Sequence, residues 1–176
     1  MKKLMIMLAA VAVAVAANAT TFSWGISGGT LDAEKFASGT AYLFYTSATT
    51  MSLPSTSGWD TKTSWSESDI TAAGVTKYGT GDVVNGAFTA TGIDLTSLDG
   101  TTGVKRFYMA VISDDGKSVA LVTSTKTARI MAATTGQSAL WTPTQFATYS
   151  APVPEPTSGL LMLMGLGALA LRRRKA

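Results

Sequence analysis

The central part of the chain arranges apolar and polar residues in short segments. Phe22, Trp24 and Ile26 share one face of the segment 21–26, and this period of two predicts a strand. The segment 40–47 carries β-forming residues on both faces, which predicts a strand in the middle of a sheet. The segment 105–113 is apolar on alternate positions of both faces and also predicts a strand.

Turn-forming residues separate these segments. Asp114-Asp115-Gly116-Lys117 predicts a turn from which 118–124 returns antiparallel, and Asn85-Gly86 predicts a β-hairpin between 83–84 and 87–89. We also expect a turn at 80–82, a strand within 125–132, and a last edge strand within 138–149. Several short strands with turns between them predict an all-β fold, as a single antiparallel β-sandwich-like domain or a partly open barrel.

A segment rich in serine and threonine, 51–68, interrupts the strands and predicts a long loop. A short helix is expected over 69–75, with Ser68 or Asp69 as its N-cap. Trp59 and Trp65 lie six residues apart in the loop. If exposed, both rings could stack on sugar rings, which makes them candidate ligand-binding residues. The alternative is that both rings cover the core.

The N-terminus has the pattern of a secretory signal peptide. Lys2 and Lys3 precede an apolar run, 4–17, and Ala17-Asn18-Ala19 has the small residues of a cleavage site. We expect a signal peptide over 1–19, export by the Sec machinery, and cleavage by signal peptidase after Ala19. The alternative is an uncleaved anchor.

The C-terminus combines an apolar run with a basic cluster. The segment 157–171 has no charge, and as a helix it reaches roughly 22 Å, short of a ~30 Å hydrocarbon core. Side-chain snorkelling and local bilayer thinning can cover that deficit. The run is followed at once by a basic cluster, Arg172, Arg173, Arg174 and Lys175. The positive-inside rule therefore predicts a transmembrane helix with its C-terminal end in the cytoplasm; the alternative is a buried core helix.

Directly before that run stands Pro154-Glu155-Pro156. Together, the Pro-Glu-Pro motif, the apolar segment 157–171 and the basic cluster resemble the PEP-CTERM sorting signal, over residues 154–176 only. The resemblance implies recognition at Pro154, Glu155 and Pro156 by an exosortase, a membrane-embedded transpeptidase-like enzyme. It further implies an inner-membrane intermediate, then delivery to the cell surface or release, often alongside exopolysaccharide. The domains predicted are thus 1–19, an exported β-rich domain over 20–150, and a sorting signal over 151–176.

The formal net charge of +3 comes from the two ends. Eight of the 14 Lys and Arg and ten of the 11 Asp and Glu lie within 20–153, so this part carries about −2. The basic balance therefore gives no indication of nucleic-acid binding. All 15 aromatic residues lie in the same part, which is typical of a folded domain and not of a disordered stalk.

Histidine and cysteine are both absent. Their absence excludes Ser-His-Asp and Cys-His catalysis, disulfide bonds, and the usual zinc and haem ligand sets, and no metal or cofactor is expected. Carboxylate pairs and Ser-Lys catalysis remain. The neighbouring carboxylates are Asp32 and Glu34, Glu67 and Asp69, Asp94 and Asp99, and Asp114 and Asp115.

Nothing in the sequence marks any of these pairs as catalytic. We therefore expect a non-catalytic exported protein of the cell surface or extracellular matrix, associated with exopolysaccharide. Two alternatives stay open: a carbohydrate-binding module, and a secreted hydrolase that uses carboxylates.

Overall fold

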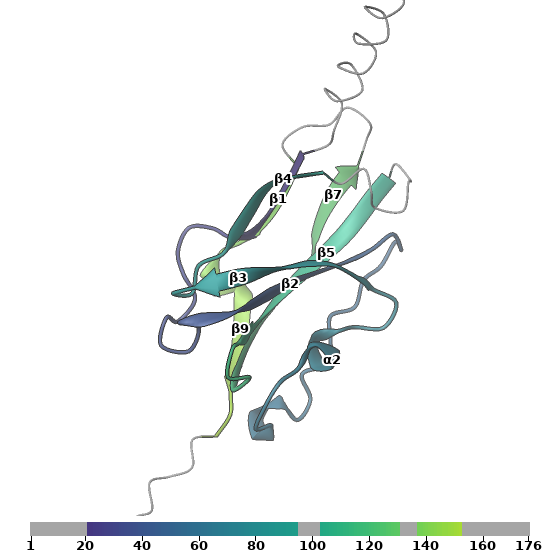
Figure 1. Ribbon diagram of the computed structural model, residues 1–176. Coiled ribbons are helices and arrows are strands. Elements are labelled where there is room, and N and C mark those ends of the chain that lie inside the picture. Colours follow the sequence, from purple (N-terminus) through teal and green to yellow (C-terminus); the bar gives the residue numbers. More distant parts are fainter. Residues whose placement is uncertain (1–20, 95–102, 131–136, 153–176) are drawn as a thin grey trace, which may run out of the picture.

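The computed structural model of this protein describes residues 21–94, 103–130 and 137–152 (Figure 1). They form two β-sheets and only three short helical turns, so the all-β prediction is confirmed. The first sheet has the order β4 (Thr89–Asp94), β1 (Thr21–Ile26), β8 (Gln137–Trp141). The second has the order β3 (Thr76–Val84), β2 (Ser38–Thr46), β5 (Gly103–Ser113), β6 (Ser118–Val122), β9 (Phe146–Ser150), with β7 (Lys126–Ile130) also on β5.

Strands β2 and β5 lie inside the second sheet, and the central position predicted for the segment 40–47 is thereby confirmed for β2. They pair antiparallel from Gly39 opposite Ser113 to Thr46 opposite Arg106. The other edge of β5 is shared, because β6 pairs with its second half and β7 with its first half. The turn 114–117 joins β5 to β6 as predicted, with Gly116 at φ +66°.

The first sheet departs from the antiparallel prediction. Strand β1 is antiparallel to β4 but parallel to β8, with Phe22 opposite Gln137 and Ile26 opposite Trp141. Along the chain, β8 follows β7, which belongs to the other sheet, so β8 does not reach β1 through a hairpin. A strand that arrives by a crossover connection is free to lie parallel to its neighbour.

The tight turn at Asn85-Gly86 is present, but the hairpin predicted around it is limited to one bridge. Both residues have positive φ (50° and 71°), as a type I′ turn requires, and Val84 and Ala87 exchange two hydrogen bonds of 3.0 Å. Beyond this bridge the chain separates, because β3 stays in the second sheet and β4 enters the first. The turn therefore joins the two sheets.

Three other predictions about local structure were wrong. The turn expected at 80–82 lies inside β3, where Gly81 pairs with Ala41. The single strand expected within 138–149 is two strands, because Pro143 starts a 3₁₀ turn (η2, Pro143–Gln145) between β8 and β9. The short helix is α2, Glu67–Ile70, with Ser66 as its N-cap and Asp69 completing a capping box.

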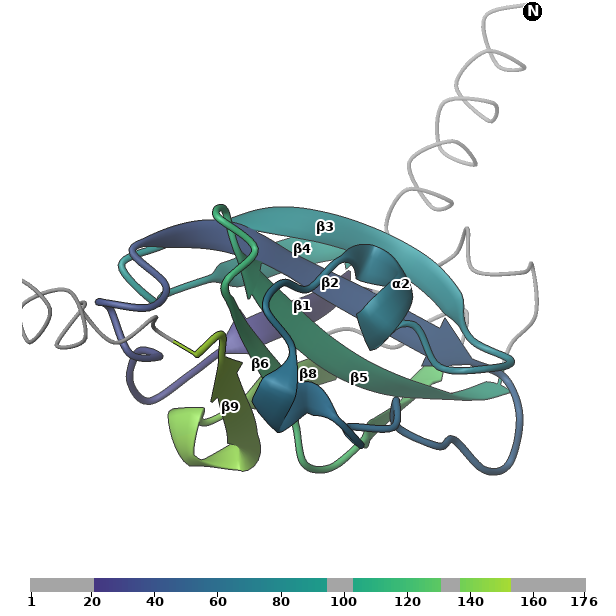
Figure 2. The same cartoon turned by 90° about the horizontal axis from the view of Figure 1, so that it is seen from below.

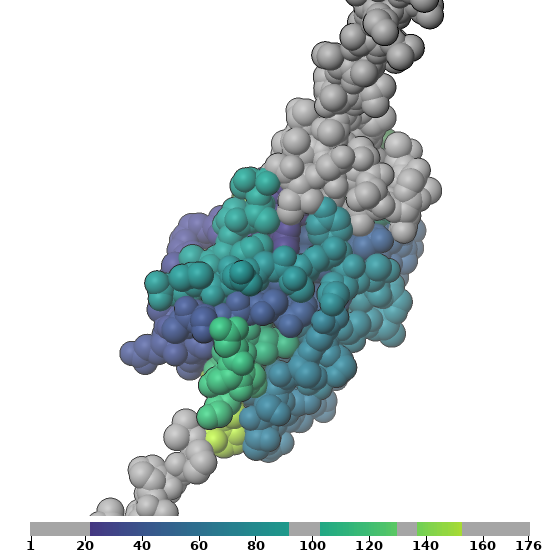
Figure 3. All heavy atoms as spheres, in the orientation of Figure 1, coloured from purple at the N-terminus to yellow at the C-terminus, as the bar shows by residue number. Residues whose placement is uncertain are grey.

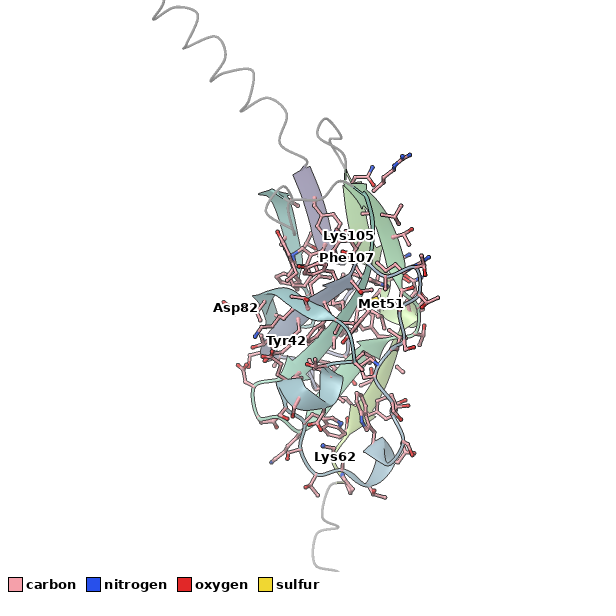
Figure 4. All side chains as sticks on the ribbon, turned by 90° about the vertical axis from the view of Figure 1, so that its right-hand side faces the viewer. Tyr42, Met51, Lys62, Asp82, Lys105 and Phe107 are labelled. Atoms are coloured by element: carbon pink, nitrogen blue, oxygen red, sulfur yellow. The ribbon has the colours of Figure 1, made fainter. Side chains whose placement is uncertain are left out.

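The two sheets enclose one core between their facing sides. Phe22 of β1 and Phe107 of β5 have ring centroids 4.9 Å apart, and Trp24 and Trp141 of the first sheet are fully buried. Figure 4 shows Phe107 directed into the body of the molecule. The predicted alternation of Phe22, Trp24 and Ile26 is confirmed, since all three are buried.

The opposite side of the second sheet is covered by residues 47–75, which we call the loop layer. It is irregular apart from η1 (Trp59–Thr61) and α2, so the predicted loop over 51–68 is largely confirmed. Figure 2 shows α2 and its neighbours lying over β2 and β5. Among the described residues, no helix combines the length and apolar character needed to cross a bilayer.

Candidate functional site

Trp59 and Trp65, the candidate sugar-stacking residues, are buried in the structure. Each is only 5% exposed, and their rings meet edge to face with centroids 6.3 Å apart. Trp59 also packs against Tyr149 of β9 at 5.1 Å. The exposure that stacking on a ligand requires is therefore not observed, and both rings attach the loop layer to the second sheet, as the alternative interpretation holds.

A buried tyrosine fastens the loop layer to the sheet. The Tyr108 hydroxyl of β5 donates a hydrogen bond to the carbonyl of Ile70 (2.8 Å) and accepts one from the backbone N–H of Ala72 (2.9 Å). Burial of the ring raises the pKa of Tyr108 to about 12, since the phenolate would lose its hydration. Tyr108 therefore stays neutral and keeps donating throughout the physiological range.

Two carboxylates of the loop layer are held by lysines. Lys62 pairs with Asp69, and Lys77 of β3 pairs with Glu67 at 2.8 Å. Partial burial would raise the pKa of Asp69, but hydrogen bonds from Lys62 and Ser66 outweigh it and hold that pKa below its usual value. Both carboxylates of the predicted pair Glu67 and Asp69 are therefore engaged in ion pairs within the protein.

The pair Asp114 and Asp115 lies in the β5–β6 turn. The Asp115 carboxylate accepts hydrogen bonds from the Ser113 hydroxyl (2.6 Å) and the Lys117 backbone N–H (2.9 Å), which lower its pKa. In contrast, no hydrogen bond or ion pair within the described part of the chain involves the Asp114 carboxylate, which is exposed. Asp115 shapes the turn, and Asp114 is available to solvent.

Two hollows flank this turn and share Ser113 and Asp114. The first, about 260 Å³, also includes Glu34, Lys35 and Ser38. The second, about 200 Å³, lies between β2, the turn and the loop layer. Its lining includes Thr40, Tyr42, Trp65, Glu67, Ile112 and Asp114. Figure 3 shows the turn, in green, exposed between β2 in indigo and the loop layer in blue.

The second hollow brings together Glu67 and Asp114, which are 47 positions apart in the chain and were not paired in the sequence analysis. The first pair, Asp32 and Glu34, stays at the surface, where Asp32 contacts Lys35 at 3.6 Å. The side chain of Asp94, and all of Asp99, lie outside what the structure describes. Within the described ranges, no group of three or more acidic residues is arranged to hold a metal ion.

No local pattern along the chain marks Tyr42 and Asp114 as neighbours in one hollow. Tyr42 lies in a strand with β-formers on both faces, which predicts burial, and Asp114 lies in a turn, where aspartate is common. Only the pairing of β2 with β5 brings the two positions to the same side of the sheet.

The remaining predicted site residues fall outside the described residues. These are the cleavage-site residues Ala17 and Ala19, the motif Pro154, Glu155 and Pro156, and the basic cluster Arg172, Arg173, Arg174 and Lys175. Comparison with protein families nevertheless identifies the C-terminal segment: residues 152–175 match the model of the PEP-CTERM protein-sorting motif.

The chain carries a PEP-CTERM sorting motif. This PEP-CTERM motif implies an exported protein that an exosortase processes, and transport toward the cell surface through a membrane-associated step. The match begins where the folded domain ends, so it gives no information about what the domain does. Neither the curated proteins nor the solved structures contain a match to this chain. The role of the domain in this PEP-CTERM protein therefore depends on the domain's own residues.

Proposed function

We propose that this protein is a non-catalytic component of the cell surface or extracellular matrix, which exosortase processing delivers and which associates there with exopolysaccharide. The observation that carries the proposal is the sorting motif at 152–175, directly after a folded all-β domain that ends at Ala151 and Pro152. A folded body joined to a removable sorting signal is suited to export and release.

The proposed route has three steps. The segment 1–19 directs the chain to the Sec machinery, and signal peptidase cuts after Ala19. The apolar segment 157–171 then holds the chain in the inner membrane, with the basic cluster 172–175 on the cytoplasmic side. Exosortase finally recognises Pro154-Glu155-Pro156 and cuts near it.

Intact mass of the surface-exposed protein tests this route. In a host with exosortase, the mass should correspond to a chain lacking both residues 1–19 and the C-terminal signal. Replacing Pro154, Glu155 and Pro156 together by alanine should leave the C-terminal segment attached and the protein in the membrane fraction. The matched control is Pro54→Ala with Glu34→Ala, in the loop layer and on an exposed turn, which should be processed normally. A full-length surface protein in the exosortase-containing host would overturn the proposal.

Association with exopolysaccharide is tested separately, by fractionation. The protein should stay with the matrix fraction of cells that make exopolysaccharide and should move to the medium in cells that do not. Equal distribution in both hosts would remove this part of the proposal and leave the sorting route intact.

A hydrolase is the second candidate, because Glu67 and Asp114 line one hollow. The Glu67 carboxylate is engaged by Lys77 at 2.8 Å, whereas a glycosidase needs one carboxyl group free to give up a proton. This arrangement favours binding over catalysis. Release of reducing ends from a glycan panel by the full chain, abolished by Asp114→Asn, would establish the hydrolase instead.

A further inference from the structure

The loop layer leaves one end of the second sheet's outer side uncovered. On β2 the outward positions are Phe44, which is buried and stacks on Tyr108 at 4.9 Å, and Tyr42, which is only half-buried. At Trp65 the loop layer is attached to the β5–β6 turn, where the Trp65 backbone N–H donates to the Gly116 carbonyl at 2.8 Å. The uncovered end therefore begins at Tyr42 and continues along β2 toward Ser38.

The two hollows adjoin at Ser113 and Asp114, which line both, and together we call them the groove. Ser38, Thr40 and Tyr42 alternate along β2 and so share one side of the sheet. Ser38 lines the first hollow, Thr40 and Tyr42 line the second, and Asp114 lines both. Each hollow is smaller than the roughly 300–1,000 Å³ of a pocket that encloses a drug-sized molecule. Two small hollows in a row suit successive units of a chain molecule better than one compact ligand.

The groove combines apolar rings with free hydrogen-bonding groups. Tyr42 supplies aromatic surface, and the buried Trp65, only 5% exposed, lines the second hollow behind it. The Asp114 carboxylate and the Thr40 hydroxyl supply polar atoms. A pyranose ring has the same two characters, with apolar C–H groups on its face and hydroxyls on its edge. A carboxylate accepts strong, charge-assisted hydrogen bonds from such hydroxyls.

The charge around the groove selects among sugars. Asp82 of β3 lies opposite Thr40 of β2, two positions along β3 from the partner of Tyr42. Glu67 is neutralised by Lys77 at 2.8 Å, but Glu34, Asp114 and Asp115 face only one lysine, Lys35, in the lining of the groove, so this end is acidic overall. Like charges repel, so uronic acids and phosphorylated or sulfated glycans are disfavoured here.

We propose that this groove binds a neutral polysaccharide, with one sugar ring on Tyr42 and its hydroxyls on Asp114. The inference rests on the proposed association with exopolysaccharide and adds to it a site and a charge class. It also differs from the expectation for Trp59, which lines neither hollow.

Calorimetric titration of the detergent-solubilised full chain tests the inference without depending on exosortase. The probes are neutral hexasaccharides of glucose, galactose and mannose, with hexagalacturonate as the acidic probe. At least one neutral probe should bind, and hexagalacturonate should bind at least about tenfold more weakly. Tyr42→Leu and Asp114→Asn should each weaken binding about tenfold or more. Asp60→Asn, an exposed aspartate of η1 outside both hollows, is the matched control and should bind as the unmodified chain does.

A second measurement locates the ligand directly. With 5-fluorotryptophan incorporated, the neutral probe should shift the fluorine resonance of Trp65 and leave those of Trp24 and Trp141 in place, with Trp65→Phe giving the assignment. Failure of every neutral probe to bind overturns the inference, as does binding that Tyr42→Leu and Asp114→Asn leave unchanged. Preference for hexagalacturonate overturns the charge argument. None of these results touches the mass-based test of sorting, so the two proposals fail separately.

Discussion

The two sides of the second sheet are covered in different ways. Its inner side faces another sheet, so Phe107 and its neighbours pack against regular strands such as β1. Its outer side faces the loop layer, whose attachment depends on a few points: Trp59, Ile70, and the hydroxyl of Tyr108. Continuous strand packing fixes the inner side along its whole length, whereas the outer side is fixed point by point. The groove lies where those points end.

The largest expected effect is on the inner side. Phe107→Ala should lower the free energy of unfolding by about 3–5 kcal/mol, because it leaves a cavity against Phe22 between two rigid sheets. Denaturant titration should show one cooperative transition at a lower midpoint. The half-buried Phe146 of edge strand β9 is the control, and Phe146→Ala should cost clearly less. If Phe107→Ala and Phe146→Ala lowered the free energy of unfolding equally, the greater importance of the inner interface would be contradicted.

A smaller effect is expected for the loop layer. Ile70 is fully buried, and Ile70→Ala should cost about 2 kcal/mol, the low end for such a change, because an irregular segment can partly close the cavity. Hydrogen exchange should accelerate in residues 59–72 and stay unchanged in β1 and β5. Equal acceleration in all strands would show that the loop layer and the sheets unfold as one unit.

The stabilisation that the Tyr108 hydroxyl gives to the outer side of the sheet depends on pH. Tyr108→Phe should cost about 1–3 kcal/mol at pH 7, because it leaves the Ala72 N–H without its acceptor. The folded-state pKa of Tyr108, about 12, lies above the usual value of 10.0, so the unfolded chain loses this proton first. The stabilisation is therefore fully present below pH 10 and declines between pH 10 and 12.

Denaturant titrations of both proteins at pH 8 and pH 11.5 provide the measurement. The stability difference between the unmodified chain and Tyr108→Phe should narrow at the higher pH. A difference that is constant over this range would contradict the buried, neutral phenol.

The smallest expected effect is at the Lys62–Asp69 pair. Both side chains are partly exposed, so Lys62→Met should cost less than about 1 kcal/mol at pH 7. Because the folded-state pKa of Asp69 is lowered, the pair contributes fully above the usual carboxyl pKa and loses this contribution as the pH falls from that value through the lowered folded-state pKa. Acidification should therefore lower the free energy of unfolding less in Lys62→Met, which lacks the Lys62–Asp69 pair, than in Lys35→Met, which keeps it. Lys35 belongs to the more exposed pair with Asp32.

Sequence patterns predicted the inner side well and the outer side poorly, for physical reasons. Alternation over Phe22, Trp24 and Ile26 reports burial directly, since side chains on one strand face point the same way. Gly81 suggested a turn, but it lies in β3 beneath the ring of Phe88, a contact made seven residues later in the chain. The burial of Trp59 depends on Tyr149, ninety residues away, and no local pattern contains that contact.

Local sequence patterns also could not predict the groove. Tyr42, Trp65 and Asp114 come from a strand, a loop and a turn that have no common periodicity, so only the pairing of β2 with β5 and the path of the loop layer bring them together. In contrast, the sorting motif depends only on local order along the chain, and it could be identified without any knowledge of the fold.

The backbone N–H of Ala151 donates to the carbonyl of Lys117 at 2.8 Å, so the folded body holds the chain until one residue before the sorting motif. From Ala151 to Pro154 the backbone can span only about 10 Å. In the proposed route, so short a tether would keep the β5–β6 turn and Asp114 on the side of the domain that faces the bilayer. The proposed polysaccharide would then reach the groove only after the cut, so that release would precede binding.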